Sequence, residues 1–265
     1  MAGERQVNWK TLFIEGTAII VSILLAFAID AWWQDRKRAE DERESLELIS
    51  RDLRSSIEQL EEARGFARTS SDAALRAYVA LSAPGPHDAA TIRPDILRVD
   101  RRTIKLPRAA YTDLVTTGNL RIIEDRALRD AIVRFYGQVD RIELIFLMNN
   151  QAILDRQWQD TFYRSGMLLP RTSDGMGLGL LDRTQVLLQS RLPEGFTHPA
   201  EPFWSLPPDS REWSSARSVA VNAALTHIVA EVIFDGLIAE AGELDALVQA
   251  WLSRNGSHTA PDAAE

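Results

Sequence analysis

Side chains that could carry chemistry are few in this sequence and lie far apart. The chain of 265 residues has four histidines, and these are His87, His198, His227 and His258. No HExxH motif is present, and no histidine has a carboxylate at metal-ligand spacing. His227 falls within an apolar helical pattern, which favours a packed imidazole over a ligand. The sequence therefore predicts no metal site.

A glycine-rich run at residues 175–179 is the nearest match to a phosphate-binding loop. It lacks the GxGxxG spacing, a Walker lysine and a preceding strand, so a flexible loop is expected. No GxSxG or SxxK motif marks a serine nucleophile. The absence of cysteine excludes thiolate chemistry, disulfides and cysteine-bound zinc. We expect neither catalysis nor a cofactor, although a site assembled from residues distant in sequence stays open as an alternative.

Charged clusters have simpler explanations than catalysis. Arg101, Arg102 and Lys105 could hold a phosphate or a lipid headgroup, or form an ordinary basic surface. Glu124 and Asp125 are better explained by capping of the following helix than by acid–base chemistry. The net charge of −8 and the pI near 5.2 argue against a nucleic-acid partner.

The feature that positions everything else is the apolar stretch at residues 12–33. Its length of about 22 residues corresponds to roughly 33 Å of helix, enough to cross a bilayer. Its central run at 19–25 is apolar on all sides, and Trp9, Trp32 and Trp33 stand at the ends of the stretch, where interfacial aromatic belts occur. A buried core helix and a signal peptide are the rival interpretations, but a charged helix follows without a cleavage site. The sequence predicts one transmembrane helix, with the lipid bilayer as a partner.

A stripe of small and acidic residues runs along this stretch at spacings of three and four. It consists of Glu15, Ala18, Ser22, Ala26 and Asp30. Small residues at such spacing let a second membrane helix approach closely, which predicts a helix–helix contact face. The alternative is that both acids reach water near the helix ends and that the small residues have no special role. For orientation, four basic residues follow the span, against two and the amino terminus before it, which slightly favours a cytoplasmic domain.

The rest of the chain predicts an all-α protein in which the membrane helix continues into an elongated antiparallel helical bundle. We expect a polar tail at 1–11, a bundle domain at 34–254 and a disordered tail at 255–265. Within the domain, 34–45 is a charged stalk and 165–208 an irregular insertion, in which 180–192 is a candidate short helix. Residues 88–107 are ambiguous, with Pro94 limiting any helix and residues 103–106 open to an extended conformation.

Three long helices are expected from the apolar periodicity. The first ends before Pro84, the second is capped by Asp125 and reaches about Tyr163, and the third follows an Asp209–Glu212 capping box. The predicted apolar positions include Leu46, Ile49, Leu53, Leu60, Leu75 and Leu81, then Ile132, Phe135, Tyr136, Phe146 and Met148, then Ala216, Val219, Leu225, Ile228, Val232, Leu237, Leu244 and Leu247.

A short motif lies between the first and second long helices. It comprises Tyr111, Leu114, Thr117, Gly118 and Asn119. Tyr111 and Leu114 share one helix face, and Gly118 can take a left-handed turn, which predicts a packing role. Alternatively, Tyr111, Thr117 and Asn119 line a small polar pocket.

This motif and the anchor together resemble a known family. The matching residues are Glu15, Gly16, Ala26, Trp32 and Leu53, then Ala110 to Leu114, Thr117 to Leu120, Ile122, Ile123, Asp125, Leu128 and Tyr136. The chain resembles a group of bacterial single-pass membrane proteins known only as a domain of unknown function. The resemblance leaves 165–208 unmatched and implies an inner-membrane helical protein with no assigned activity.

These observations predict a membrane-anchored structural or interaction protein that self-associates or joins a membrane complex. The alternative is an extracytoplasmic ligand-sensing bundle that transmits a shift through the continuous helix into the membrane. Few residues precede the span, so no output domain is expected on its far side.

Overall fold

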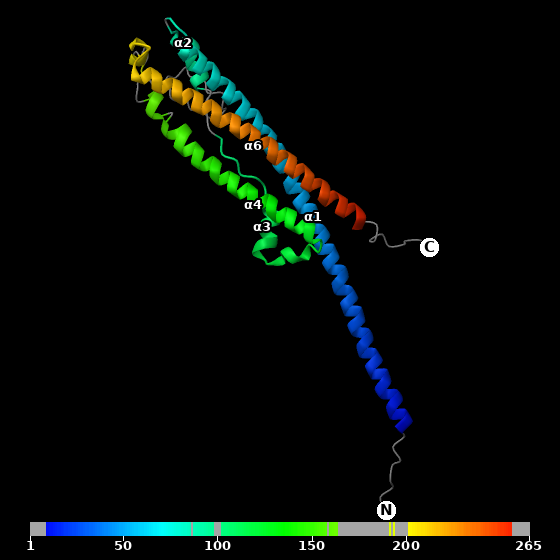
Figure 1. Cartoon of the computed structure of the whole chain (residues 1–265). Helices are drawn as coiled ribbons and strands as arrows, with labels where there is room; N and C mark the ends of the chain where they lie inside the picture. Colours follow the sequence, from blue (N-terminus) through cyan, green and yellow to red (C-terminus); the bar gives the residue numbers. More distant parts are fainter. Residues whose placement is uncertain are drawn as a thin grey trace, which may run out of the picture.

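The computed structural model describes residues 9–85, 87–97, 102–157, 159–163 and 201–255, with the single positions 191 and 193 (Figure 1). Within these ranges, the side chains at 9–16, 18, 97, 153–155, 159 and 163 lie outside the description. Every regular element in the described part is helical, and no strand occurs there. The all-α prediction is confirmed for this part of the chain.

Helix α1 runs without interruption from Trp9 to Ser82, a length of 74 residues. At 1.5 Å per residue it spans about 110 Å. It contains no proline, the residue that most strongly breaks a helix interior. Pro84 and Gly85 follow its last turn, and Gly85 has a left-handed φ of 114° that turns the chain away. One rod therefore joins the predicted anchor, the stalk at 34–45 and the far end of the molecule (Figure 1).

Helix α6, Arg211–Asn255, runs back along α1 in the opposite direction (Figure 1). Ion pairs cross the seam from Arg54 to Asp245 at 3.0 Å and from Arg64 to Asp235 at 2.9 Å. Small side chains line this seam and let the two backbones approach closely. They are Ala63, Ala67, Ala73, Ala74 and Ala77 on α1 and Ala216, Ala220, Ala223, Ala224, Ala230 and Ala241 on α6.

The first turn of α6 is capped by Ser210. Its Oγ accepts a hydrogen bond from the Trp213 N–H at 3.4 Å, and its carbonyl accepts one from Ser214 at 3.1 Å. The predicted capping box at Asp209 and Glu212 is therefore wrong by one residue. The reason is a preceding turn, in which Ser210 N–H donates to Pro207 at 2.9 Å and leaves Asp209 outside the helix.

A short helical hairpin packs on the lower part of α1. It consists of α3 (Ala109–Thr116), a 3-10 turn η1 (Asn119–Ile122) and α4 (Arg126–Asn149). Gly118 joins the first two with a left-handed φ of 73°. Asp125 caps α4 by accepting a hydrogen bond from Leu128 N–H at 3.1 Å, as the sequence predicts. Residues 102–108, which lead into the hairpin, have no regular secondary structure.

Beyond Asn149 the helix widens. Residues Asn150–Gln157 (η2) and Gln159–Tyr163 (η3) have π-helical winding. The predicted helix to about Tyr163 is correct in extent, but its regular α winding ends earlier. Asn149 and Asn150 are poor helix formers, and the buried Asn150 amide donates to Arg102 O at 3.2 Å, a tertiary bond that favours the irregular turn.

The distal end of the molecule holds α2 (Ala89–Leu97) and a 3-10 turn η4 (Pro202–Ser205). Asp88 Oδ1 accepts the Ala90 N–H at 3.0 Å and so starts α2, which accommodates Pro94 near its middle. Phe203 of η4 is fully buried. The end of the predicted irregular insertion at 165–208 is thus part of a core. Nearly all the rest of that insertion, the predicted helix at 180–192 and residues 256–265 lie outside the described residues.

Two apolar cores hold these elements together. The larger core joins α1, α3, α4 and the second half of α6. Its largest buried side chains include Leu46, Ile49, Leu53, Leu60, Ile123, Ile132 and Tyr136. The distal core joins α1, α2, η4 and the first half of α6 around Trp213 and Phe203. We refer to all the packed helices, including α1 from Glu42 onwards, as the body.

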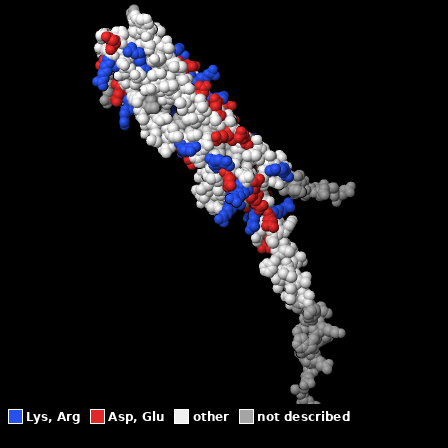
Figure 2. Space-filling model, viewed as in Figure 1, with Lys and Arg blue, Asp and Glu red and all other residues white. Residues whose placement is uncertain are grey.

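Below the body, α1 stands alone. None of its described side chains from residue 19 to residue 40 is buried, and Glu42 is the first that is. Figure 2 shows a largely uncharged stretch of this helix emerging from a body that carries charge along its length. The freely standing part described here covers most of the predicted transmembrane stretch and the predicted stalk.

Among the described residues, α6 is the helix that is long and apolar enough to cross a membrane, with a mean hydropathy of 1.5 over its most apolar window. One third of that window is buried. Because α6 packs along the whole body, its apolar character reflects in part a core position. The first residues of the predicted span at 12–33 are among those whose side chains lie outside the description.

Candidate interaction surfaces

The free segment of α1 carries apolar side chains on all sides at residues 19–33. We name this surface the sleeve. Its large members are Ile19, Ile20, Val21, Ile23, Leu24, Leu25, Phe27, Ile29, Trp32 and Trp33, all at least half exposed. A continuous apolar surface of this size is rare on a soluble monomer and marks a membrane or protein contact.

The predicted contact stripe lies partly on this sleeve. Ser22, Ala26 and Asp30 are exposed there, whereas the side chains of Glu15 and Ala18 lie outside the description. Asp30 accepts a hydrogen bond from Gln34 Nε2 at 2.9 Å, one turn further along the same helix. The Asp30 carboxylate therefore has a hydrogen-bond donor on its own helix and does not need one from a second helix.

The tryptophans at the upper end of the sleeve form a pair. The rings of Trp32 and Trp33 are 6.4 Å apart and tilted, and both are exposed. The guanidinium of Arg36 lies 5.9 Å from the Trp32 ring centre, a cation–π geometry. An amphipathic ring beside a cation suits the boundary between lipid and water. The third predicted interfacial residue, Trp9, begins α1, and its side chain is outside the description.

Two carboxylates of α1 hold the hairpin of α3, η1 and α4 against it. Glu42 Oε1 accepts the Glu124 N–H at 2.8 Å, and Asp52 Oδ2 accepts the Ala110 N–H at 3.0 Å. Burial raises the pKa of Glu42; the Glu124 N–H opposes that rise, and the charges of Glu124 and Asp125 add to it. The base of the body thus contains a carboxylate that is costly to ionise.

The predicted motif at 111–119 is divided between core and surface. Tyr111 stacks on Tyr136 with ring centres 4.4 Å apart, and Leu114 is buried. Thr117 and Asn119 are exposed, and Thr117 Oγ1 donates to Asp113 O at 2.7 Å. Neither cavity described below is lined by these residues. The arrangement matches the packing interpretation of Tyr111 and Leu114, while Thr117 and Asn119 do not come together with Tyr111 in a described pocket.

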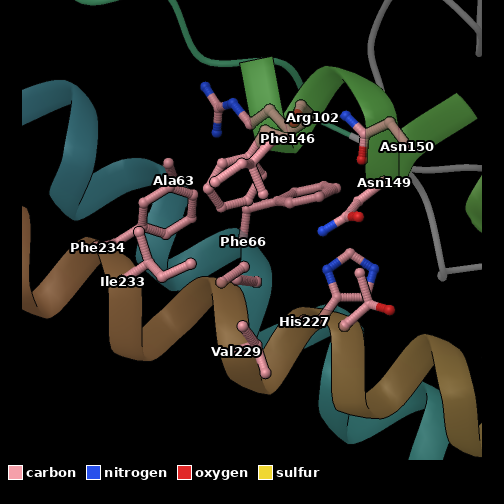
Figure 3. Close-up of a pocket in the computed structure, with 14 residues that line it drawn as sticks. Ala63, Phe66, Arg102, Phe146, Asn149, Asn150, His227, Val229, Ile233 and Phe234 are labelled. Atoms are coloured by element: carbon pink, nitrogen blue, oxygen red, sulfur yellow. Dashed lines mark hydrogen bonds between the residues drawn. The ribbon is translucent and has the colours of Figure 1, made fainter. Parts of the chain in front are cut away.

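A small cavity lies between α1, α4 and α6 at the point where α4 changes to π winding (Figure 3). Its volume is about 30 Å³, the room needed by one water molecule. Phe66, Phe146 and Phe234 form much of its wall, with the last two stacked at 5.0 Å. The buried His227 also lines it, with its ring 6.3 Å from that of Phe66.

A larger, open cleft of about 500 Å³ lies between α1 and the end of α6. Arg43, Arg51 and Arg54 line it, but Arg43 pairs with Glu47 and Arg54 with Asp245. Asp245 also accepts a 2.5 Å hydrogen bond from Ser50 Oγ, which in turn accepts one from Gln249 at 2.8 Å. This network fastens the end of α6 to α1. Sequence reasoning missed it because its members come from opposite ends of the chain.

A buried ion pair also escaped sequence reasoning. Arg93 of α2 pairs with Glu201, and both side chains are almost wholly buried in the distal core. Trp204 Nε1 donates to the second Glu201 oxygen at 3.0 Å. The available signal was an arginine between two apolar positions, Ile92 and Ile96, of a short helix. Of the basic cluster considered at 101–105, Arg102 pairs with Glu62 at 2.7 Å, Lys105 is exposed and Arg101 lies outside the description.

No group of histidines and carboxylates in the described part of the chain has the geometry of a metal site. Comparison with known proteins adds no relative, since no family model, no curated protein and no solved structure matches the chain. The resemblance to the family of single-pass membrane proteins therefore stays a prediction.

Proposed function

We propose that this chain is a membrane-anchored interaction protein. In this proposal residues 12–33 span a bilayer, the inner membrane of a bacterium, and α1 carries the body above its surface. The observation that carries the proposal is the sleeve, because so much apolar surface is unfavourable in water and is satisfied in lipid. The Trp32–Trp33 pair and Arg36 would then lie at the lipid–water boundary.

The membrane part of the proposal is tested by extraction of the full-length chain from native membranes. Alkaline carbonate removes proteins that are attached at the surface, whereas a spanning helix stays with the lipid until detergent is added. We expect the chain to remain in the membrane pellet under carbonate. A chain that leaves the membrane under carbonate and stays soluble without detergent would contradict the proposal.

We further propose that the chain self-associates, or joins a membrane complex, through the stripe of small residues. Ala26→Leu enlarges a residue on the stripe, and Ala28→Leu is the matched control on the opposite side of the helix. Close helix approach depends on small side chains, so Ala26→Leu should lower crosslinking in membranes several-fold while the control keeps it. An equal effect of both substitutions, or a monomer that neither changes, would count against the stripe.

The location of the body is proposed as cytoplasmic, from the slight excess of basic residues after the span. The sensing alternative is favoured by one observation, the unbroken α1 that connects the distal core with the sleeve. A reporter fused to the carboxyl end separates the two. Activity of a cytoplasmic reporter removes the sensing alternative, and activity of an exported reporter favours it.

A further inference from the structure

The outer faces of α4 and α6 have a second exposed apolar surface that the anchor does not explain. On α6 it consists of Leu225, Ile228, Val229, Val232 and Leu247, and on α4 of Leu144, Ile145, Leu147 and Met148. We name these nine residues the lateral face. Ile145 and Val229 line the same cavity from the two helices, so the two sets adjoin at these residues. The lateral face explains why α6 is apolar enough to resemble a membrane helix although one third of its most apolar window is buried.

The charges around the lateral face differ between the two helices. On α4, Arg134 and Arg141 are exposed and have no acidic partner among the described residues. On α6, Glu243 is exposed within the apolar stripe and has no basic partner among those residues. A surface that carries unpaired basic side chains on one helix and an unpaired acidic side chain on the neighbouring helix is complementary to itself after a half turn.

Two contacts fix the level of α4 against α6. Gln138 Nε2 donates to Glu240 at 2.9 Å, and Phe146 stacks on Phe234. Because the helices are antiparallel, Arg134 is level with the turn that contains Glu243. By the same register, Met148 is level with the turn that contains Val232. Along the helix axes, Arg134 and Glu243 therefore lie at one level, and Met148 and Val232 lie at another.

We propose that the lateral face binds a second copy of this chain, related by a two-fold axis perpendicular to the membrane. This proposal rests on the proposed membrane anchor, which holds both copies upright and at the same height. The half turn then brings α4 of each copy against α6 of the other. Arg134 meets Glu243 of the second copy, and Met148 meets its Val232.

The test uses the absence of native cysteine, since any introduced thiol is unique. Met148→Cys and Val232→Cys are made in separate, differently tagged full-length chains, which are co-expressed and treated in membranes with a short thiol crosslinker. Val79→Cys replaces Val232→Cys as the matched control, because Val79 is 65% exposed and Val232 is 67% exposed but Val79 lies on α1. We expect the Met148–Val232 pair to give at least fivefold more mixed-tag product than the control pair.

Charge reversal provides an independent arm. Arg134→Glu or Glu243→Arg alone should lower the dimer affinity about two- to fivefold, the scale of a charge pair at an interface rim. The double variant restores the pair and should recover the affinity. Because both side chains are exposed, thermal unfolding of the three variants should match that of the parent chain.

Two outcomes would overturn the proposal. One is equal crosslinking of the test and control pairs, and the other is a double variant that shows no recovery. A chain that crosslinks through its anchor but not through the lateral face would remain a self-associating membrane protein, so the proposed function would stand. Release of the chain by carbonate would instead remove the anchor, and with it the upright geometry assumed here.

Discussion

Tyr136 places a hydroxyl group inside the body, where it has no hydrogen-bond partner among the described residues. Burial raises its pKa, with the nearby charge of Asp52 adding to the effect. The ring, by contrast, is held on both sides, by stacking on Tyr111 and by an edge contact with Phe135. The side chain therefore stabilises the fold through its ring and not through its oxygen.

Replacement of this tyrosine should separate the two contributions. Tyr136→Phe removes only the unsatisfied hydroxyl, so the free energy of unfolding should change by less than about 1 kcal/mol or rise slightly. Tyr136→Ala removes the ring and should cost about 3–5 kcal/mol. Denaturant unfolding of the detergent-solubilised chain measures both values. A loss above about 2 kcal/mol for the phenylalanine variant would mean that the hydroxyl has a partner after all.

Glu42 gives the base of the body a pH dependence of definite sign. Its pKa in the folded chain lies above the ordinary value of 4.5, mainly because of burial. The folded state therefore prefers the protonated acid, so this contribution to stability is complete below pH 4.5 and is lost as the pH rises through the folded pKa. At neutral pH the ionised group opposes folding.

The prediction concerns Glu42→Gln. The amide keeps an oxygen to accept the Glu124 N–H but carries no charge, so the variant should melt at a higher temperature than the parent at pH 7. This advantage should shrink as the pH falls through the folded pKa of Glu42 and should be lost below pH 4.5, where the parent carboxyl is protonated in both states. Thermal unfolding at several pH values is the measurement, and an advantage independent of pH would contradict the assignment.

At the scale of the elements, α2 and η4 depend on the buried pair of Arg93 and Glu201. Two buried charges stabilise each other only while both are present, so loss of one leaves the other unpaired in an apolar core. Glu201→Gln or Arg93→Met alone should cost about 3–5 kcal/mol of unfolding free energy. The double variant Arg93→Met with Glu201→Gln should cost clearly less than the sum of the two single losses.

Hydrogen exchange of the distal end provides the readout, because α2 should open first in the single variants. Additive losses in the double variant would show that the two charges act independently. Trp204 belongs to the same network through its bond to Glu201, and Trp204→Phe tests whether that third member matters.

Local signals in the sequence located the helices well, whereas contacts between distant segments could not be inferred. The Asp125 cap and the proline-free length of α1 depend on neighbouring residues, and both agree with the structure. The Ser210 cap depends on a turn formed with Pro207, and the π winding after Asn149 coincides with a bond to Arg102. Each of these needs knowledge of the fold.

Helix α6 illustrates the limit of periodicity. Its predicted apolar positions form one periodic series in the sequence, yet Leu225, Ile228, Val232 and Leu247 are exposed while Ala216, Val219, Leu237 and Leu244 are buried. Alanine-rich positions form the seam with α1, so larger residues remain on the outer side. Leu75 on α1 and Met148 on α4 are exposed as well. Hydrophobicity alone does not tell a core face from a docking face.

At the scale of the whole molecule, the length of α1 sets the height of the body above a membrane. From Trp33 to Ser82 the helix rises about 74 Å at 1.5 Å per residue. A fluorophore at Ala83→Cys should therefore transfer little energy to acceptors at the bilayer surface, whereas one at Glu40→Cys should transfer strongly. Similar transfer from both sites would mean that the body lies along the membrane and does not stand on it.

Because α1 is one uninterrupted helix, it fixes the angle about its axis between the small residues of the sleeve and the lateral face. Insertion of one alanine in the stalk would turn the two about 100° out of phase, and seven would bring them back within about 20°. If the dimer uses the small residues of the sleeve and the lateral face together, both faces must point towards the same partner. Dimer formation should then be lost after the insertion of one alanine and regained after the insertion of seven. Under the proposed pairing, the length of the stalk sets the angle between the two contact faces, so only insertions close to a whole number of turns keep both faces directed at the same neighbour.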